Sequence, residues 1–289
     1  MEEENKKKEF LMSVGMVRDD RILPEARWLA VLIIPFLVVA FILLYFWPHD
    51  TDKLFAWTIK PAMTPMMLAA AYLGGIYFFT RAALAKRWHL VKLGFLPVTA
   101  FAALLGVATI LHWDRFNHSH ISFFTWVALY FTTPFLVFAV WLRNRTTDPG
   151  TAESNEVIIP QVTRLFIGVV GVITLAVSLL LFLQPDLMIR LWPWMLTVGA
   201  MFVLPGVVGL GIALEKRRSA ARIILESQAF SIVMILIATA RAWSDFEQSN
   251  LITWLFVGGL SFLLVAIAAL YASIELHRRN VVKGHSLSV

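Results

Sequence analysis

Long apolar blocks alternate with short polar stretches along the chain. A helix of about 20 residues crosses a bilayer core of about 30 Å, and in lipid every backbone amide must be satisfied within its own segment. The pattern therefore predicts an all-α integral membrane protein. We expect eight spans, at residues 28–47, 62–82, 91–111, 121–142, 163–183, 191–214, 219–242 and 250–275. Because only Glu215 to Arg218 separate the sixth and seventh blocks, seven spans is the alternative count.

The composition agrees with this architecture. Of the 289 residues, 59% are hydrophobic, 15% are charged and none is cysteine. A soluble domain is usually about a quarter charged, so the composition excludes a soluble enzyme, a disordered chain and a disulfide scaffold. The first span follows Lys6 to Lys8, but it is longer than the apolar region of a signal peptide and ends in Phe46-Trp47-Pro48. We therefore expect a retained span.

The basic residues predict the orientation of the spans. Of the 25 Lys and Arg, 20 fall on one side of the eight-span arrangement and five on the other. The positive-inside rule then places both termini in the cytoplasm, in a multi-pass protein of the cytoplasmic (inner) membrane. The net charge of +6 is accounted for by anionic inner-leaflet lipid, without nucleic acid as a partner.

Two parts of the chain match each other in the order of their motifs, which predicts an internal repeat. At one offset, Leu43, Pro48, Trp57, Gly74 and Arg81 match Leu180, Pro185, Trp194, Gly211 and Arg218. The match resumes after a shorter cytoplasmic turn, where Trp113, Phe116 and Thr125-Trp126 fall on Trp243, Phe246 and Thr253-Trp254.

The repeat predicts the domain organisation. A cytoplasmic segment (1–27) precedes a first four-helix repeat (28–142), a cytoplasmic linker (143–162), a second four-helix repeat (163–276) and a cytoplasmic tail (277–289). Since four is an even number of spans, the two repeats are parallel and their pseudo-twofold axis lies along the membrane normal.

Glu226 is the only carboxylate well inside a predicted span, on the order of 10 Å from its cytoplasmic end. Ionisable groups inside a membrane usually face the bundle interior or water, which makes Glu226 a functional candidate. Arg222 lies four residues earlier on the same helix face, and Gln228 extends the polar strip. The alternative is a structural pair in which Arg222 reaches the headgroups while it binds Glu226.

An outer loop holds a candidate metal site, formed by His112, Asp114, His118 and His120. Neutral imidazole suits zinc, copper or nickel. The spacing matches no recognised metal signature, and the second repeat has Ala242 in place of His112. A polar loop without a metal is therefore the alternative.

Other cofactor motifs are missing from the sequence. There is no nucleotide-binding P-loop, zinc-protease motif or serine-hydrolase motif, and there is no cysteine to hold an iron–sulfur cluster. The two parallel four-helix halves resemble haem A synthase, but that family needs histidines inside the helices of both halves. Spans five to eight contain no histidine before His277, so a haem site is excluded.

The residues Leu54 to Thr58 and Leu111 to Phe116 resemble an uncharacterised family of bacterial multi-pass membrane proteins with about eight spans. The resemblance covers mainly the first half of the chain. It implies no activity, so no functional residue can be carried over.

Three functional hypotheses remain. The first is non-enzymatic transport of a small solute or ion through the bundle between the two repeats. The second is an accessory or structural subunit that assembles with copies of itself or with other membrane subunits. The third is a metal-dependent membrane enzyme that uses the His112 to His120 loop.

Overall fold

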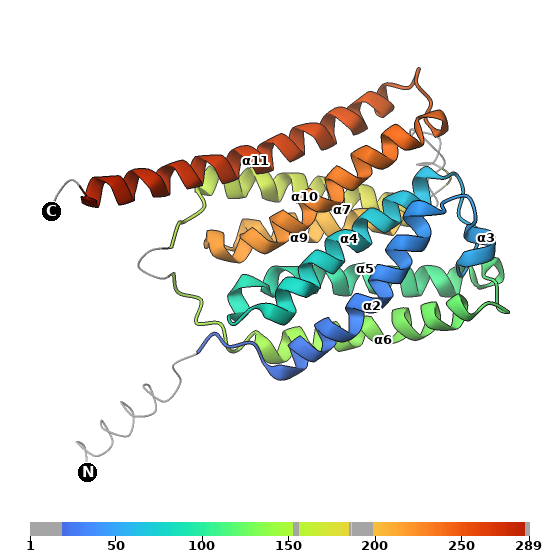
Figure 1. Ribbon diagram of the computed structural model, residues 1–289, viewed down its shortest axis with the longest axis horizontal. Helices are drawn as coiled ribbons and strands as arrows, with labels where there is room; N and C mark the ends of the chain where they lie inside the picture. The colour runs from blue at the N-terminus through green and yellow to red at the C-terminus, as the bar shows by residue number, and fades with distance from the viewer. Residues whose placement is uncertain (1–18, 153–155, 185, 187–198, 287–289) are drawn as a thin grey trace, which may run out of the picture.

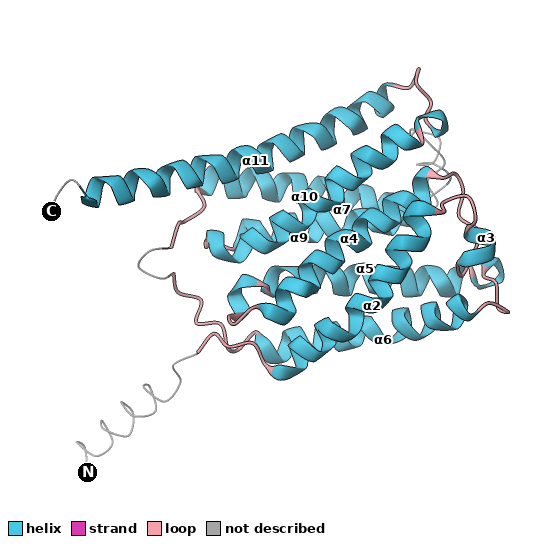
Figure 2. Ribbon diagram, viewed as in Figure 1, coloured by secondary structure: helices cyan, strands magenta, loops and turns pink. Residues whose placement is uncertain are grey.

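The computed structural model describes residues 19–152, 156–184, 186 and 199–286. Within these residues the regular secondary structure is helical, loops and turns connect the helices, and three isolated β-bridges join segments of the loops (Figure 2). The long helices are α2 (Pro24–Phe46), α4 (Met63–Leu84), α5 (Lys92–Leu111), α6 (Ile121–Asn144), α7 (Gln161–Leu183), α10 (Arg218–Arg241) and α11 (Leu251–Ser286). The short ones are α3 (Thr51–Leu54), η1 (Trp88–Leu90), η2 (Trp113–Arg115), η3 (Gly199–Phe202), α9 (Val203–Leu214) and η4 (Trp243–Asp245).

Seven helices in the described part of the chain are long and apolar enough to cross a membrane. This confirms the all-helical class, and the length and apolar character of these helices suggest a membrane protein. The predicted sixth span, 191–214, is represented by the shorter apolar helix Ala200–Leu214, and residues 191–198 lie outside the described residues. A turn at Glu215–Arg217 separates α9 from α10, so these are two helices. Helix α11 continues to Ser286, into the predicted tail.

The helices lie side by side in one bundle (Figure 1). Helix α2 packs along α4, α5 along α6, α7 along α9, and α10 along α11. Helices from the two halves also meet, because α4 packs on α10 and α5 on α9. The α4–α10 contact is close at Gly74, whose carbonyl accepts a hydrogen bond from Ser227 Oγ at 2.8 Å. A Cβ at Gly74 would lie 2.2 Å from Ser231 Oγ, so only glycine fits without a shift.

The connections after α2, α5 and α10 lie at one end of the bundle (Figure 1). Those after α4, α6 and α9 lie at the other end, which we call the linker end because it carries residues 145–160. One buried apolar cluster includes Phe55, Met63, Met66, Leu68 and Trp126, and a second includes Phe78, Phe79, Trp88, Phe95 and Ile212. Large apolar side chains also cover the outside of the bundle, which fits a lipid bilayer.

Corresponding turns in the two halves have the same local structure. At the end of α5, His112 has φ −121° and ψ 31°, and at the end of α10, Ala242 has φ −110° and ψ 33°. A single 3₁₀ turn follows each helix and ends at Phe116 or Phe246, both extended. Helices α2 and α7 each have 23 residues.

The structure corrects part of the sequence alignment at the linker end. Arg81 lies inside α4, whereas Arg218 begins α10, so these two arginines are not equivalent. Arg87 and Arg217 are the corresponding residues, because each directly precedes a helix start and pairs with the strand-like segment before α2 or α7.

Candidate functional site

At the linker end, the turn before η1 and the turn before α10 are held in the same way. Arg21, in the segment before α2, forms an antiparallel bridge with Arg87. Ile158, in the segment before α7, forms the equivalent bridge with Arg217. These pairings fix the starts of η1 and α10 next to the segments that lead into α2 and α7. We call this arrangement the junction.

Each of the two helix starts is capped by a carboxylate. The His89 N–H donates to Asp20 Oδ1 at 3.0 Å, and the Ser219 N–H donates to Glu156 Oε1 at 3.0 Å. The first N–H groups of a helix have no partner within the helix, and a carboxylate satisfies both their hydrogen-bonding need and the positive end of the helix dipole. Asp20 adopts the left-handed conformation, with φ 55°.

The same four residues form one hydrogen-bonded chain across the two halves. His89 Nδ1 is hydrogen-bonded to Asp20 Oδ2, and His89 Nε2 lies 3.1 Å from Ser219 Oγ. Ser219 Oγ in turn lies 2.7 Å from Glu156 Oε2. We call this series of four hydrogen-bonded side chains the relay. Because His89 is 4% exposed and Asp20 is 8% exposed, the relay is mostly screened from water.

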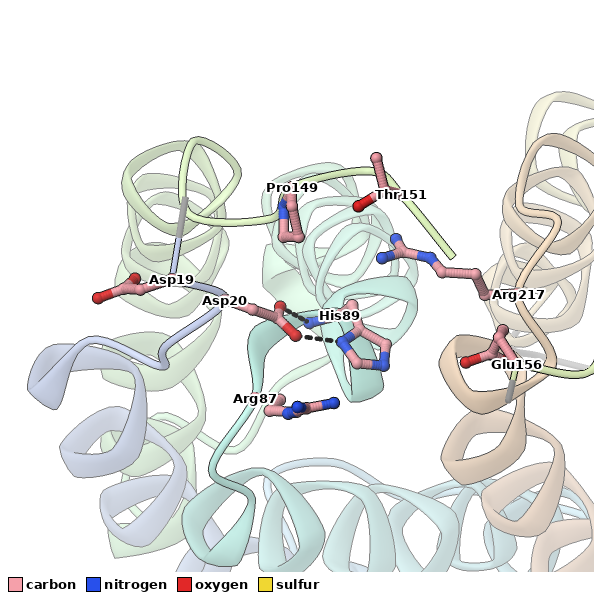
Figure 3. A pocket seen from close by; sticks show the side chains of 8 residues that line it. All are labelled: Asp19, Asp20, Arg87, His89, Pro149, Thr151, Glu156 and Arg217. Atoms are coloured by element: carbon pink, nitrogen blue, oxygen red, sulfur yellow. Dashed lines mark hydrogen bonds and ion pairs between the residues drawn. The ribbon is translucent and has the colours of Figure 1, made fainter. Parts of the chain in front are cut away.

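A cavity of about 200 Å³ lies at the junction (Figure 3). Its walls come from the segment before α2, the η1 turn, the linker and the turn before α10. The lining residues are Asp19, Asp20, Arg87, His89, Pro149, Thr151, Glu156 and Arg217. The cavity therefore exposes carboxylate, imidazole and guanidinium groups from both halves to a single space.

Beside the cavity, four charged side chains form an ion cluster. Arg217, which is 4% exposed, donates to both oxygens of Asp148 at 2.9 and 2.7 Å and from Nε to Glu215 Oε1 at 3.0 Å. Lys92 Nζ lies 2.8 Å from Asp148 Oδ2 and 2.5 Å from Glu215 Oε2. The cluster ties the linker to the starts of α5 and α10.

The ion cluster shifts the pKa values of its members. Burial alone would raise the pKa of Asp148, but hydrogen bonds from Arg217, Lys92 and the Gly150 N–H hold it well below its usual range. Burial also opposes ionisation of Glu215, yet hydrogen bonds from Arg217 and Lys92 lower its pKa from 4.5 to about 2. Both carboxylates are therefore charged at neutral pH.

The structure brings Glu226 and Arg222 together, as the sequence predicts. Arg222 Nε donates to Glu226 Oε1 at 2.9 Å, and the Tyr77 hydroxyl of α4 donates to Glu226 Oε2. Glu226 has a side chain 18% exposed, while Arg222 is exposed. Gln228 lies two positions further along α10 and faces away from Glu226, because two residues turn a helix by about 200°. The tyrosine partner was not predicted.

The four candidate metal ligands in the connection between α5 and α6 do not converge. Within the described residues, no group of three or more His, Asp or Glu side chains could hold a metal ion. His118 Nε2 lies 3.0 Å from Trp113 O, and the Asp114 side chain is 78% exposed beside Arg115. His112 lies at the C-terminal end of α5.

His120 has a structural partner instead. Its Nδ1 accepts from the Ser122 N–H at 3.2 Å, which makes it the N-cap of α6. Asn250 has the same place before α11, where its side chain accepts from the Ile252 N–H at 2.9 Å. His120 thus caps α6 in the same way that Asn250, a common type of N-cap residue, caps α11.

Asp20, His89, Glu156 and Ser219 were not predicted from the sequence. A signal was present, because the offset that matches Trp113 to Trp243 also matches His89 to Ser219. The offset that matches Arg81 to Arg218 pairs other residues at this end of the bundle, so it does not reveal this correspondence.

No family model matches the chain, and no curated protein or solved structure matches it either. The function must therefore be argued from the geometry of the chain itself.

Proposed function

We propose that this chain is an eight-span protein of the cytoplasmic membrane, built from two parallel four-helix repeats, that moves a small polar solute or ion between the repeats. The first repeat contains α2, α4, α5 and α6, and the second contains α7, the helix ending at Leu214, α10 and α11. The repeat is supported by the matching turns after α5 and α10 and by the matching bridges of Arg87 and Arg217.

The cavity at the junction is the observation that carries the transport proposal. Asp19 and Glu156 come from corresponding segments before α2 and α7, and Arg87 and Arg217 come from corresponding turns. Two pairs of corresponding residues therefore line the same space. Repeat transporters bind their substrates near the bilayer midplane at the interface between the repeats, and the cavity lies at one end of the proposed interface. The cavity is therefore our candidate for the cytoplasmic entrance site.

The charge distribution supports a cytoplasmic position for this entrance. The linker end also carries Arg21, Arg27, Lys86 and Lys216, which belong to the basic side of the predicted topology. Beyond the cavity, the cluster around Phe78 and Phe95 fills the space between the helices. In the proposed mechanism, the solute enters from the cytoplasm, and α4–α10 and α5–α9 must separate to pass it outward.

Uptake into proteoliposomes tests the proposal. The probes are labelled potassium, ammonium, glycine, acetate and phosphate, which are small enough for the cavity and differ in charge. We expect saturable uptake of at least one probe, which Glu156→Gln abolishes and Glu247→Gln leaves unchanged. Glu247 is a matched control, because it is an exposed carboxylate at the opposite end of the bundle. Monodisperse, helical protein that moves none of the probes would contradict the proposal.

Glu226→Gln tests the intramembrane carboxylate in the same assay. Loss of uptake would place the Glu226–Tyr77–Arg222 group on the solute path. Unchanged uptake would restrict the mechanism to the cavity and make this group a structural one.

A second candidate function is an accessory subunit of a larger membrane assembly. It is favoured by α11, whose apolar span is only 11% buried, against 28% for α6. A Cβ added at Gly258 or Gly259 of α11 would meet nothing within 4 Å. Native mass spectrometry after mild extraction tests this function, since a stoichiometric partner chain would support it and a chain that always appears alone would contradict it.

A further inference from the structure

With both carboxylates ionised, the relay has too few hydrogen atoms unless His89 is protonated on both ring nitrogens. Asp20 and Glu156, when ionised, only accept hydrogen bonds. The Ser219 hydroxyl has one hydrogen, and its contact of 2.7 Å with Glu156 Oε2 is the shorter of its two contacts. The contact of 3.1 Å between Ser219 Oγ and His89 Nε2 then needs a hydrogen on the ring nitrogen.

The partner on the other ring nitrogen leads to the same result. His89 Nδ1 faces Asp20 Oδ2, a second acceptor, so this nitrogen also carries a hydrogen. The charged and titratable groups around the ring are Asp20 and Asp19 before α2, Arg87 on its own turn, and Glu156 and Arg217 from the other half. Arg217 is neutralised by Asp148 and Glu215, and the positive ring lies between the two capping carboxylates.

We propose that His89 is a proton-binding site shared by the two repeats, and that its proton fastens their cytoplasmic ends together at the cavity. The inference extends the proposed function to proton control of the same cavity, and it relies on the two-repeat arrangement. When the Nε2 proton leaves, Ser219 can satisfy either the ring or Glu156, but not both. The contact between the first and second repeats then weakens, and the cavity can widen.

The arrangement is not that of a serine hydrolase, although Asp20, His89 and Ser219 follow the order of a catalytic triad. Ser219 is not among the residues that line the cavity, and its N–H and hydroxyl both contact Glu156. An acyl substrate would find neither an accessible nucleophile nor a free backbone donor at this serine. A role in proton binding uses the contacts as they stand.

The distance between the repeats provides the test. The chain has no cysteine, so a Lys86→Cys/Lys216→Cys variant places spin labels only at two exposed, corresponding positions of the junction. The distance between the labels is measured by pulsed electron paramagnetic resonance, in lipid nanodiscs, from pH 5 to pH 9. We expect a narrow distribution at low pH that becomes longer and broader as the pH rises.

Two further substitutions, each added to the Lys86→Cys/Lys216→Cys variant, show whether His89 causes the change in distance. His89→Gln keeps a hydrogen-bonding side chain but cannot bind the proton, so the pH dependence should disappear. His118→Gln, at an exposed outer position, should retain it. A distance that does not change with pH in the parent, or that still changes with pH in His89→Gln, overturns the inference. Because this readout needs no solute, a failure of the uptake assay leaves its result unaffected.

Discussion

Arg87 and Arg217 occupy corresponding positions in the two turns of the junction, yet their environments are opposite. Arg87 is exposed, whereas Arg217 is buried between Asp148 and Glu215. The backbone frame is the same in both turns, since each arginine is bridged to the segment before the first helix of its half. The buried position of Arg217 comes from two neighbours, Glu215, which stands where the first turn has Ala85, and Asp148 of the linker.

The two turns therefore share one backbone arrangement but have different roles. The second turn is fixed by ion pairs that hold the linker in place. The first turn leaves its arginine exposed at the cavity and contributes His89 to the relay. We expect substitutions at the second turn to affect mainly stability, and those at the first turn to affect mainly binding and pH response.

Arg217→Gln should have the largest effect on stability. It removes the guanidinium partner of two buried carboxylates, Asp148 and Glu215, and breaking a buried ion pair costs about 3 kcal/mol or more. The midpoint of thermal unfolding in detergent should fall sharply. Arg87→Gln, the matched control, removes an exposed charge and should cost less than about 1 kcal/mol. Equal effects of the two substitutions would contradict the comparison.

We expect the second largest effect on stability at the close contact between α4 and α10. In Gly74→Leu the side chain would collide with Ser231 and with the Ser227 backbone, and overpacking of this kind typically costs about 1–3 kcal/mol. Gly258→Leu on α11 meets nothing within 4 Å and should leave the unfolding midpoint unchanged or slightly raised. A tolerated Gly74→Leu would show that α4 and α10 are not in close contact.

Acid should weaken the ion cluster. The folded pKa of Glu215 is about 2 and its ordinary value is 4.5, so its contribution to stability is complete at neutral pH and is lost as the pH falls from 4.5 towards 2. Asp148 changes stability in the same direction. Unfolding midpoints measured from pH 7 to pH 3 should fall, and Arg217→Gln should flatten the dependence. A midpoint that rises on acidification would contradict the assigned pKa directions.

The outer loop should show the smallest effects. His120→Ala and Asn250→Ala each remove one helix N-cap and should each cost about 1 kcal/mol, while His120→Asn should be nearly neutral. Added zinc should change neither the wild-type midpoint nor that of His120→Asn. Zinc-dependent stabilisation that His120→Asn abolishes would return the loop to the metal hypothesis.

The sequence predicts the class of this fold well, because apolar blocks as long as a bilayer is thick have few other structures available. It also predicts the Arg222–Glu226 pair, since four residues separate neighbours on one helix face. The starts and ends of α2, α5 and α7 fall within a few residues of the predicted spans.

The cavity could not be predicted in the same way. Asp20 and Glu156 come from polar loop segments and His89 and Ser219 from the first turns of helices, and none of these segments contains a recognised motif. Only the packing of the two halves brings them together. His120 is the opposite case, because its residue type is typical of metal sites, yet here it caps a helix.

The sidedness of two pairs of equivalent positions, one pair at each end of the bundle, most directly tests the central claim that the two repeats are parallel. Single cysteines replace Ser119 and Ser249 in the outer loops, and Lys86 and Lys216 at the junction, all exposed in the structure. A membrane-impermeant maleimide is then applied to right-side-out and inside-out vesicles. Two parallel repeats with a cytoplasmic cavity predict that positions 119 and 249 react only in right-side-out vesicles and that 86 and 216 react only in inside-out vesicles. Reaction of 119 and 249 from opposite sides would contradict the account.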